Sequence, residues 1–141
     1  MGNSQRFSEK QPSREQDEEE VLEREEIVEL FRTLLQRYRY SIDPLPESAP
    51  DVARAYELRG KWIRQQRRAA KQQGTPAAAI HAKFSILTSL VDAGYDDHFY
   101  IDDYLLPELE GLEELARAAG DELLARRIGR RIVQLDTDEL A

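Results

Sequence analysis

The chain has 141 residues, of which 40% are hydrophobic and 34% charged, and its formal net charge is −8. It contains no cysteine, which excludes disulfide bonds, thiolate metal sites and cysteine nucleophiles. No stretch approaches the ~20 apolar residues of a membrane-spanning helix, and the first residues lack a secretory signal pattern, so we expect one cytoplasmic domain without membrane contact.

The charges are segregated along the chain. Residues 1–50 carry seven Lys and Arg against twelve Asp and Glu, residues 51–95 carry eight against three, and residues 96–141 carry five against thirteen. A basic middle therefore lies between two acidic flanks. Overall acidity disfavours non-specific nucleic-acid binding, because phosphates attract a positive surface, but the basic middle is compatible with it.

The first fifty residues predict a tail and one long helix. Residues 1–14 are rich in Gln, Ser, Pro and charge, which is typical of disorder. Ser13 is placed to cap a helix over 15–40. Apolar residues recur along that helix at three-, four- and seven-residue spacing: Val21, Val28, Phe31, Leu35 and Tyr38. We expect this stripe to pack in the core, and the alternative is a homo-oligomer formed through helix 15–40.

The middle of the chain predicts two further helices. The prolines of SIDPLPESAP end the first helix, and Ser48 is placed to cap a second helix over 50–73. Gly74 ends the second helix, and Thr75 begins a third at once. The third helix is the most apolar and runs to Gly94, so we expect it to be central, with neighbours on two sides.

AGYDDHFYIDDY, residues 93–104, gathers four aspartates, a histidine and several aromatic side chains. We interpret it as a turn capped by Asp96 or Asp97, with Phe99, Ile101 and Tyr104 pointing inward. Asp102 or Asp103 is then expected to cap the next helix. The exposed members form an acidic rim and a candidate second binding surface: Tyr95, Asp96, Asp97, His98, Tyr100, Asp102 and Asp103.

The C-terminal third predicts a pair of helices. The fourth helix begins near Asp102 or Pro107, at a point that the pattern does not define. Gly120 ends it, and Asp121 caps a fifth helix. Residues 137–141 are expected to fray. No segment alternates with the period of a strand, so the predicted fold is all-α: a single-domain bundle of about five helices over 15–136.

The sequence lacks the patterns of the familiar catalytic and cofactor sites. A di-iron bundle needs Glu three residues before His, whereas His81 follows Ala78 and His98 follows Tyr95 at that spacing. No phosphate-binding Gly-rich loop and no Gly-x-Ser-x-Gly turn is present. We therefore expect no catalytic residue, no metal site and no cofactor, and a divalent-metal enzyme using the Asp96–Asp103 cluster ranks only third.

The strongest binding candidate is the basic part of the second helix. Lys61, Arg64, Arg68 and Lys71 recur at three- and four-residue spacing and share one face. Aromatic residues and arginine are enriched at interface hot spots. The predicted partner-binding surface is accordingly Tyr56, Arg59, Lys61, Trp62, Arg64, Arg67, Arg68 and Lys71.

A DNA-reading helix-turn-helix is a weaker interpretation of the same region. Ala70, Gly74 and Ile80 have the spacing of that motif. However, Gln73 and Lys83 stand where apolar residues are needed, and the helix that would enter the groove begins with alanines that read no base.

We therefore expect a non-enzymatic protein–protein interaction module, such as an adaptor, regulator, inhibitor or assembly factor, that binds another protein through a charged and aromatic helical surface. Nucleic-acid binding through the basic helix 59–71 is the alternative.

Overall fold

The computed structural model describes residues 20–140, and the side chains of residues 20–137. The predicted tail over 1–14 and the predicted cap at Ser13 lie outside the described residues. Within the described part, the chain forms five α-helices, one π-helical turn and no strand: α3 (Arg24–Arg37), α4 (Pro50–Gln73), α5 (Pro76–Asp92), η2 (Tyr100–Leu105), α6 (Leu106–Ala118) and α7 (Glu122–Leu140). The predicted all-α bundle of about five helices is confirmed.

Two of the predicted helix junctions are confirmed in detail. Gly74 has φ 70°, in the left-handed region that glycine adopts without strain, and it ends α4. The Thr75 side chain then accepts a hydrogen bond from the Ala78 N–H at 3.1 Å and caps α5. Asp121 caps α7 in the same way, because its carboxylate accepts from the Leu124 N–H at 3.0 Å.

The beginning of the first helix differs from the prediction. Residues 20–23 precede the helix, and α3 starts at Arg24. The side chain of Gln65 holds this segment on α4: it accepts from the Leu22 N–H at 2.9 Å and donates to the Glu20 carbonyl at 2.7 Å. Glu26 accepts from the Glu23 N–H at 2.8 Å, which marks the N-terminus of α3. Val21 is consequently exposed and lies outside the apolar stripe.

Three other boundaries differ from the prediction. The first helix ends at Arg37, and the chain turns over residues 38–40. The N-cap of α4 is Ala49 rather than Ser48, so no side chain caps it. The last helix does not stop near residue 136, because α7 continues to Leu140.

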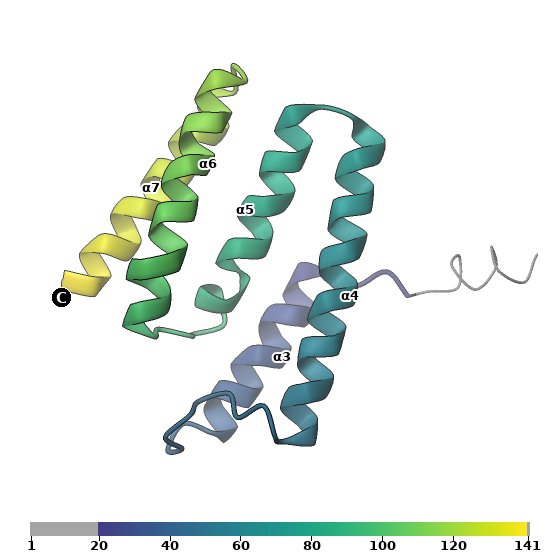
Figure 1. Cartoon of the computed structure of the whole chain (residues 1–141), viewed down its shortest axis with the longest axis vertical. Helices are drawn as coiled ribbons and strands as arrows, with labels where there is room; N and C mark the ends of the chain where they lie inside the picture. The colour runs from purple at the N-terminus through teal and green to yellow at the C-terminus, as the bar shows by residue number, and fades with distance from the viewer. Residues whose placement is uncertain (1–19, 141) are drawn as a thin grey trace, which may run out of the picture.

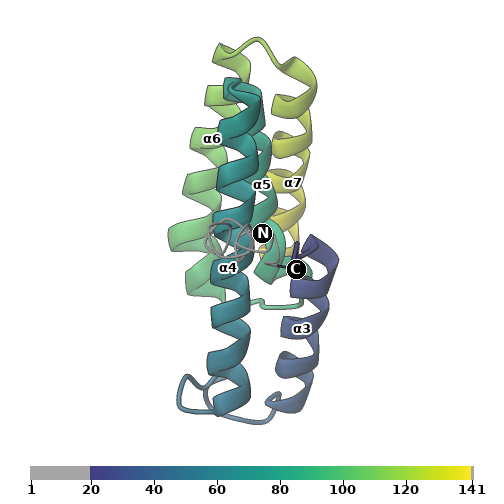
Figure 2. The ribbon, with the colours of Figure 1, turned by 90° about the vertical axis from the view of Figure 1, so that its right-hand side faces the viewer.

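The helices form two packed groups that share α5. Figure 1 shows α6 and α7 together at one edge, α5 in the middle and α4 at the other edge, with α3 in the lower middle beside the lower half of α4. Seen from the side, α7 and α3 lie on the same side of α5, with α7 in the upper half and α3 in the lower half (Figure 2). Contacts of α5 with α3, α4 and α6 confirm the predicted central position of this most apolar helix.

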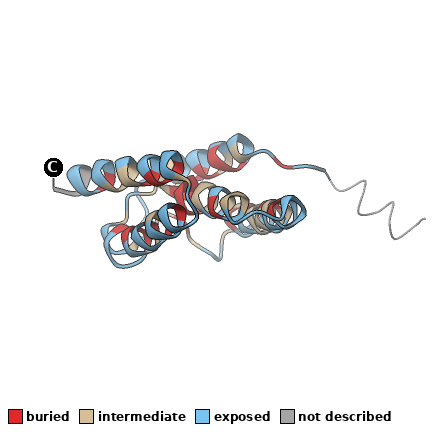
Figure 3. Cartoon of the chain, turned by 90° about the horizontal axis from the view of Figure 1, so that it is seen from above, coloured by how far each residue is buried: buried red, intermediate tan, exposed pale blue. Residues whose placement is uncertain are grey.

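Two hydrophobic cores follow from this arrangement. The buried parts of the ribbon lie mostly on the sides of the helices that are turned toward one another (Figure 3). One core lies between α5, η2, α6 and α7, and its fully buried members include Leu105, Leu109 and Ile128. The other lies between α3, α4 and the end of α5, around Phe31 and Trp62. The stripe of α3 therefore packs inside its own chain, as expected.

In the described part of the chain, no helix combines the length and the apolar composition that crossing a membrane requires.

Candidate partner-binding groove

The basic helix α4 turns its tryptophan inward. Val52, Ala55, Arg59 and Trp62 follow one another at three- and four-residue spacing, so they share the face that packs on α3 and α5. The exposed fraction of Trp62 is 0%. The prediction that Trp62 anchors a partner is therefore wrong. Trp62 stands at helical spacing from Val52 and Ala55, and this apolar pattern in the sequence could have predicted its place in the core.

Arg59 is half-buried and points toward α5. Its guanidinium donates to the Ile86 carbonyl at 3.3 Å and to the Ser89 hydroxyl at 3.4 Å, both on α5. Burial lowers the pKa of Arg59, because desolvation disfavours the charged form. The residue ties α4 to α5, so we remove it from the predicted contact surface.

The remaining cations of α4 do face outward. Arg64, Arg67, Arg68 and Lys71 are exposed, whereas Lys61 is half-buried. Tyr56 is 38% exposed, and its ring meets the edge of Phe31 at a centroid distance of 5.3 Å. The predicted surface is therefore divided: Arg64, Arg67, Arg68 and Lys71 lie on the outside of α4, Arg59 and Lys61 are half-buried, and Trp62 lies in the core.

The acidic stretch after α5 is a turn and a rim. Asp97 accepts from the Phe99 and Tyr100 N–H groups at 2.9 and 3.0 Å, which confirms the predicted turn cap. Asp96, Asp102 and Asp103 are exposed.

The other details of that stretch differ from the prediction. Ile101 is buried as expected, but Phe99 and Tyr104 are 72% and 49% exposed. Asp102 and Asp103 cap no helix, because both residues lie in the first turn of η2 and η2 leads directly into α6. Of the predicted second surface, Tyr95 and Tyr100 are half-buried, with their rings tilted by 59° at a centroid distance of 5.2 Å, while His98 is exposed.

A groove of about 1030 Å³ lies between α4, α5 and α7, with the first residue of α3 at one end. Its α4 wall consists of Gln66, Ala69, Ala70 and Gln73, and its α7 wall of Arg127, Arg130, Arg131 and Gln134. The side chains of α5 form the floor. A smaller hollow of about 640 Å³ lies between α4, α5 and Tyr104.

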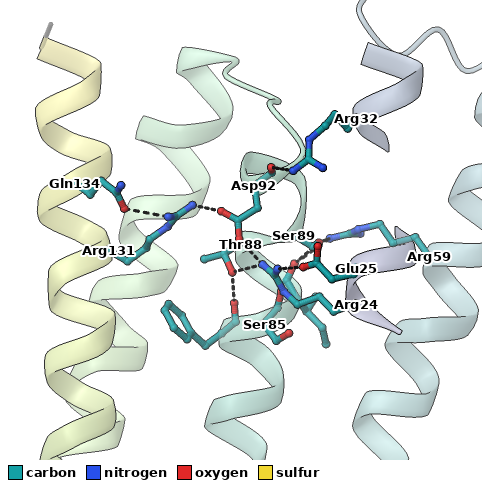
Figure 4. Close-up of polar contacts among 12 residues, drawn as sticks. Arg24, Glu25, Arg32, Arg59, Ser85, Thr88, Ser89, Asp92, Arg131 and Gln134 are labelled. Carbon is teal, nitrogen blue, oxygen red and sulfur yellow. Dashed lines mark hydrogen bonds and ion pairs between the residues drawn. The ribbon is translucent and has the colours of Figure 1, made fainter. Parts of the chain in front are cut away.

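Asp92 organises the end of the groove nearest α3. Its carboxylate accepts from Arg24 of α3 at 2.5 Å and from Arg131 of α7, so one residue of α5 joins both neighbouring elements (Figure 4). Arg24 also donates to the Thr88 hydroxyl at 3.1 Å, and Arg32 donates to the Asp92 carbonyl at 3.0 Å. A carboxylate at the C-terminal end of a helix is disfavoured by the helix dipole, and these arginines offset that cost.

The groove has a strong excess of positive charge. Asp92 is its only lining carboxylate among the described residues, and it is already bound by two arginines. Arg127 and Arg130 form no ion pair with the described part of the chain. His81 lies 4.0 Å from the Asp121 carboxylate at the edge of the floor. The groove therefore offers unneutralised guanidinium groups to an anionic ligand.

The arginines of α7 were missed because they lie in the most acidic part of the sequence. Residues 96–141 have thirteen acidic side chains, which mask a local basic face. The signal was nevertheless present: Arg127, Arg130, Arg131 and Gln134 stand at relative positions 0, 3, 4 and 7, the spacing of one helix face.

Among the side chains that the structure describes, no three His, Asp or Glu residues lie close enough together to hold a metal ion. Comparison of the chain with protein-family models, with curated proteins and with solved structures found no match. Functional inference therefore depends on the groove itself.

Proposed function

We propose that the protein is a non-enzymatic protein–protein interaction module that binds a partner in the groove between α4, α5 and α7. The observation that carries this proposal is the groove of about 1030 Å³ with free guanidinium groups on its α7 wall. Arginine binds carboxylates through two parallel hydrogen bonds. Acidic segments of another protein are the ligands that such a wall favours.

The outer face of α4 supports the same proposal in a secondary role. Its exposed cations, Arg64, Arg67 and Lys71, lie on the helix that forms one wall of the groove. Charges outside a binding site accelerate the encounter of oppositely charged partners more than they stabilise the complex. We assign these residues to steering rather than to the contact itself.

Site-specific photocrosslinking tests the proposal, because a chain without cysteine accepts a single label cleanly. Gln73→Cys places a photoreactive group on the groove wall, and Ala53→Cys places it on an exposed position of α4 outside the groove. In an extract of the protein's own cells, we expect a discrete protein adduct from Gln73→Cys and none from Ala53→Cys. Equal adducts from both positions, or none from either, would contradict the proposal.

The second candidate function is binding of nucleic acid through the exposed face of α4. It is favoured by one observation, the outward position of Arg64, Arg67 and Arg68. Duplex or single-stranded nucleic acid should then bind at low ionic strength and dissociate steeply as salt rises, because bound counterions are released. Absence of binding at 20 mM salt would eliminate this candidate.

A further inference from the structure

We infer that the partner enters the groove as an amphipathic helix, with a row of small or apolar residues against the alanines of α4 and α5 and carboxylates against the arginines of α7. This inference names the class of partner and rests on the proposed function.

The position of α3 shows how a helix fits this surface. α3 packs on both α4 and α5 and covers the part of α4 that contains Val52, Ala55 and Trp62. It begins at Arg24, which forms one end of the groove. Beyond that point α4 continues for about two turns, and side chains of α4 and α5 line the groove there. The groove is thus the continuation of a surface that already holds a helix.

The residues under the groove are small. Ala69 and Ala70 of α4 and Ala78 and Ala82 of α5 all line it, with Phe84 as the one large apolar contact. The distance between packed helix axes is about 8–10 Å and depends on the side chains at the contact. Alanines on two adjacent helices therefore allow a third helix to approach both, as in the recognition of amphipathic helices by apolar grooves.

The arginines of the α7 wall determine which side chains the partner helix needs on its other face. Arg127 and Arg130 are one turn apart on α7 and line the groove. A helix lying beside α7 presents residues at i, i+3 and i+4 to it, so carboxylates at that spacing meet both guanidinium groups. Lysine at those positions would be repelled.

The polar side chains of the walls also explain why the groove can be exposed to solvent when no partner is bound. The surface under α3 is apolar, with Trp62 fully buried, whereas the groove walls carry Gln66, Gln73 and Gln134. Permanent interfaces are more hydrophobic than those of partners that also exist alone. The mixed alanine, amide and arginine surface is suited to a partner that binds and leaves.

Designed peptides test the inference on the full chain. The probe is a 16-residue helical peptide with Ala and Leu on one face and Glu at i, i+3, i+4 and i+7 beside it. Three controls have the same length: a scrambled sequence of identical composition, the Glu-to-Lys version, and an equally acidic peptide with two prolines that prevent a helix. We expect the probe to bind at least tenfold more tightly than each control at 50 mM salt, measured by fluorescence anisotropy.

Groove variants locate the binding. Arg127→Glu combined with Arg130→Glu should weaken the probe at least tenfold and improve binding of the Lys version. Arg126→Glu is the matched control, because Arg126 is exposed on the same helix and does not line the groove. Ala69→Trp should block the probe without a change of charge, since Ala69 lines the groove and is exposed, whereas Ala53→Trp should not. Circular dichroism checks that each variant is folded.

Each other result would overturn the inference. Equal affinity for the proline-containing peptide assigns the groove to acidic chains of any conformation. Tighter binding of duplex nucleic acid, lost in the Arg127→Glu and Arg130→Glu variant, assigns it to phosphates. A concentration-dependent dimer abolished by that variant assigns it to a second copy of the chain. If the probe does not bind but the Gln73→Cys adduct still forms, the helical partner is rejected and the proposed function is kept. If neither probe binding nor the adduct is observed, both the helical partner and the proposed function are rejected.

Discussion

Trp62 is the single tryptophan of the chain and is fully buried between α3, α4 and α5. Its indole N–H has no hydrogen-bond acceptor in the described part of the structure. The residue therefore stabilises the fold through its apolar surface, and the unpaired N–H costs part of that gain.

Substitutions of Trp62 test whether the residue stabilises the core or contacts a partner. Trp62→Ala should lower the free energy of unfolding by about 3–5 kcal/mol, the cost of removing a large buried aromatic side chain. Trp62→Phe should cost less than about 1.5 kcal/mol, because it keeps most of the volume and removes the unpaired N–H. Arg64→Ala, on the exposed face of α4, should change stability by less than about 0.5 kcal/mol. Urea unfolding followed by circular dichroism measures all three, and equal effects would contradict the packing.

Asp92 tests the link between α3, α5 and α7. Asp92→Ala leaves Arg24 and Arg131 without their carboxylate, and hydrogen bonds to charged groups contribute about 1.5–3 kcal/mol. The side chains of all three are partly exposed, so we expect a loss of about 2 kcal/mol. Glu57→Ala is the control: it breaks the exposed pair with Arg54, which should cost less than about 0.5 kcal/mol. A loss no larger than that of the control would contradict a structural role for Asp92.

At the scale of elements, η2 joins the two halves of the molecule. Tyr100 at its start packs against both hydrophobic cores. Burial raises the pKa of Tyr100 to about 12, because the phenolate form is poorly solvated there, although Arg59 opposes the shift. The wide turn thus places a tyrosine that must remain neutral where the cores meet.

This burial predicts instability in alkali. The pKa of Tyr100 is raised in the folded state above the ordinary value of 10.0, so its contribution is complete below pH 10 and is lost as the pH rises from 10 to about 12. The urea midpoint of the wild type should fall more between pH 9 and pH 11 than that of Tyr100→Phe. Parallel decreases in the two proteins would show that Tyr100 is not the group responsible.

At the scale of the whole molecule, the two cores share α5, which contributes Leu87 to one and Leu90 to the other. Neither core can lose this helix without exposing the other. We therefore expect the described domain to unfold in one cooperative step, as small domains usually do.

Leu109→Ala tests this cooperativity. Leu109 of α6 is fully buried in the core that lacks the tryptophan, so its truncation should cost about 3–5 kcal/mol. If the cores unfold together, the midpoint followed by Trp62 fluorescence should fall with the midpoint followed by circular dichroism. An unchanged fluorescence midpoint would show two independent units.

Local signals in the sequence were sufficient for most of the fold. Gly74 with Thr75, and Gly120 with Asp121, mark helix ends through backbone conformations and capping hydrogen bonds that involve only near neighbours. The apolar stripe of α3 and the central place of α5 follow from helical periodicity, because one face of each helix must leave water. The cap at Ser48 was wrong because Ala49, one residue later, occupies that position.

The helices, the junctions at Gly74 and Gly120 and the acidic turn could be read from the sequence, because each depends on contacts between residues a few positions apart. Which helix faces meet could not be read from it, because that depends on packing between distant segments. Helix packing buries Trp62, half-buries Arg59 and binds the segment before α3 to Gln65. It also brings Arg127 and Arg130 beside the alanines of α4 and α5 to form the groove. The two arginines lie at least 45 positions from those alanines in the sequence, and helix packing, rather than local spacing, sets their distance in space.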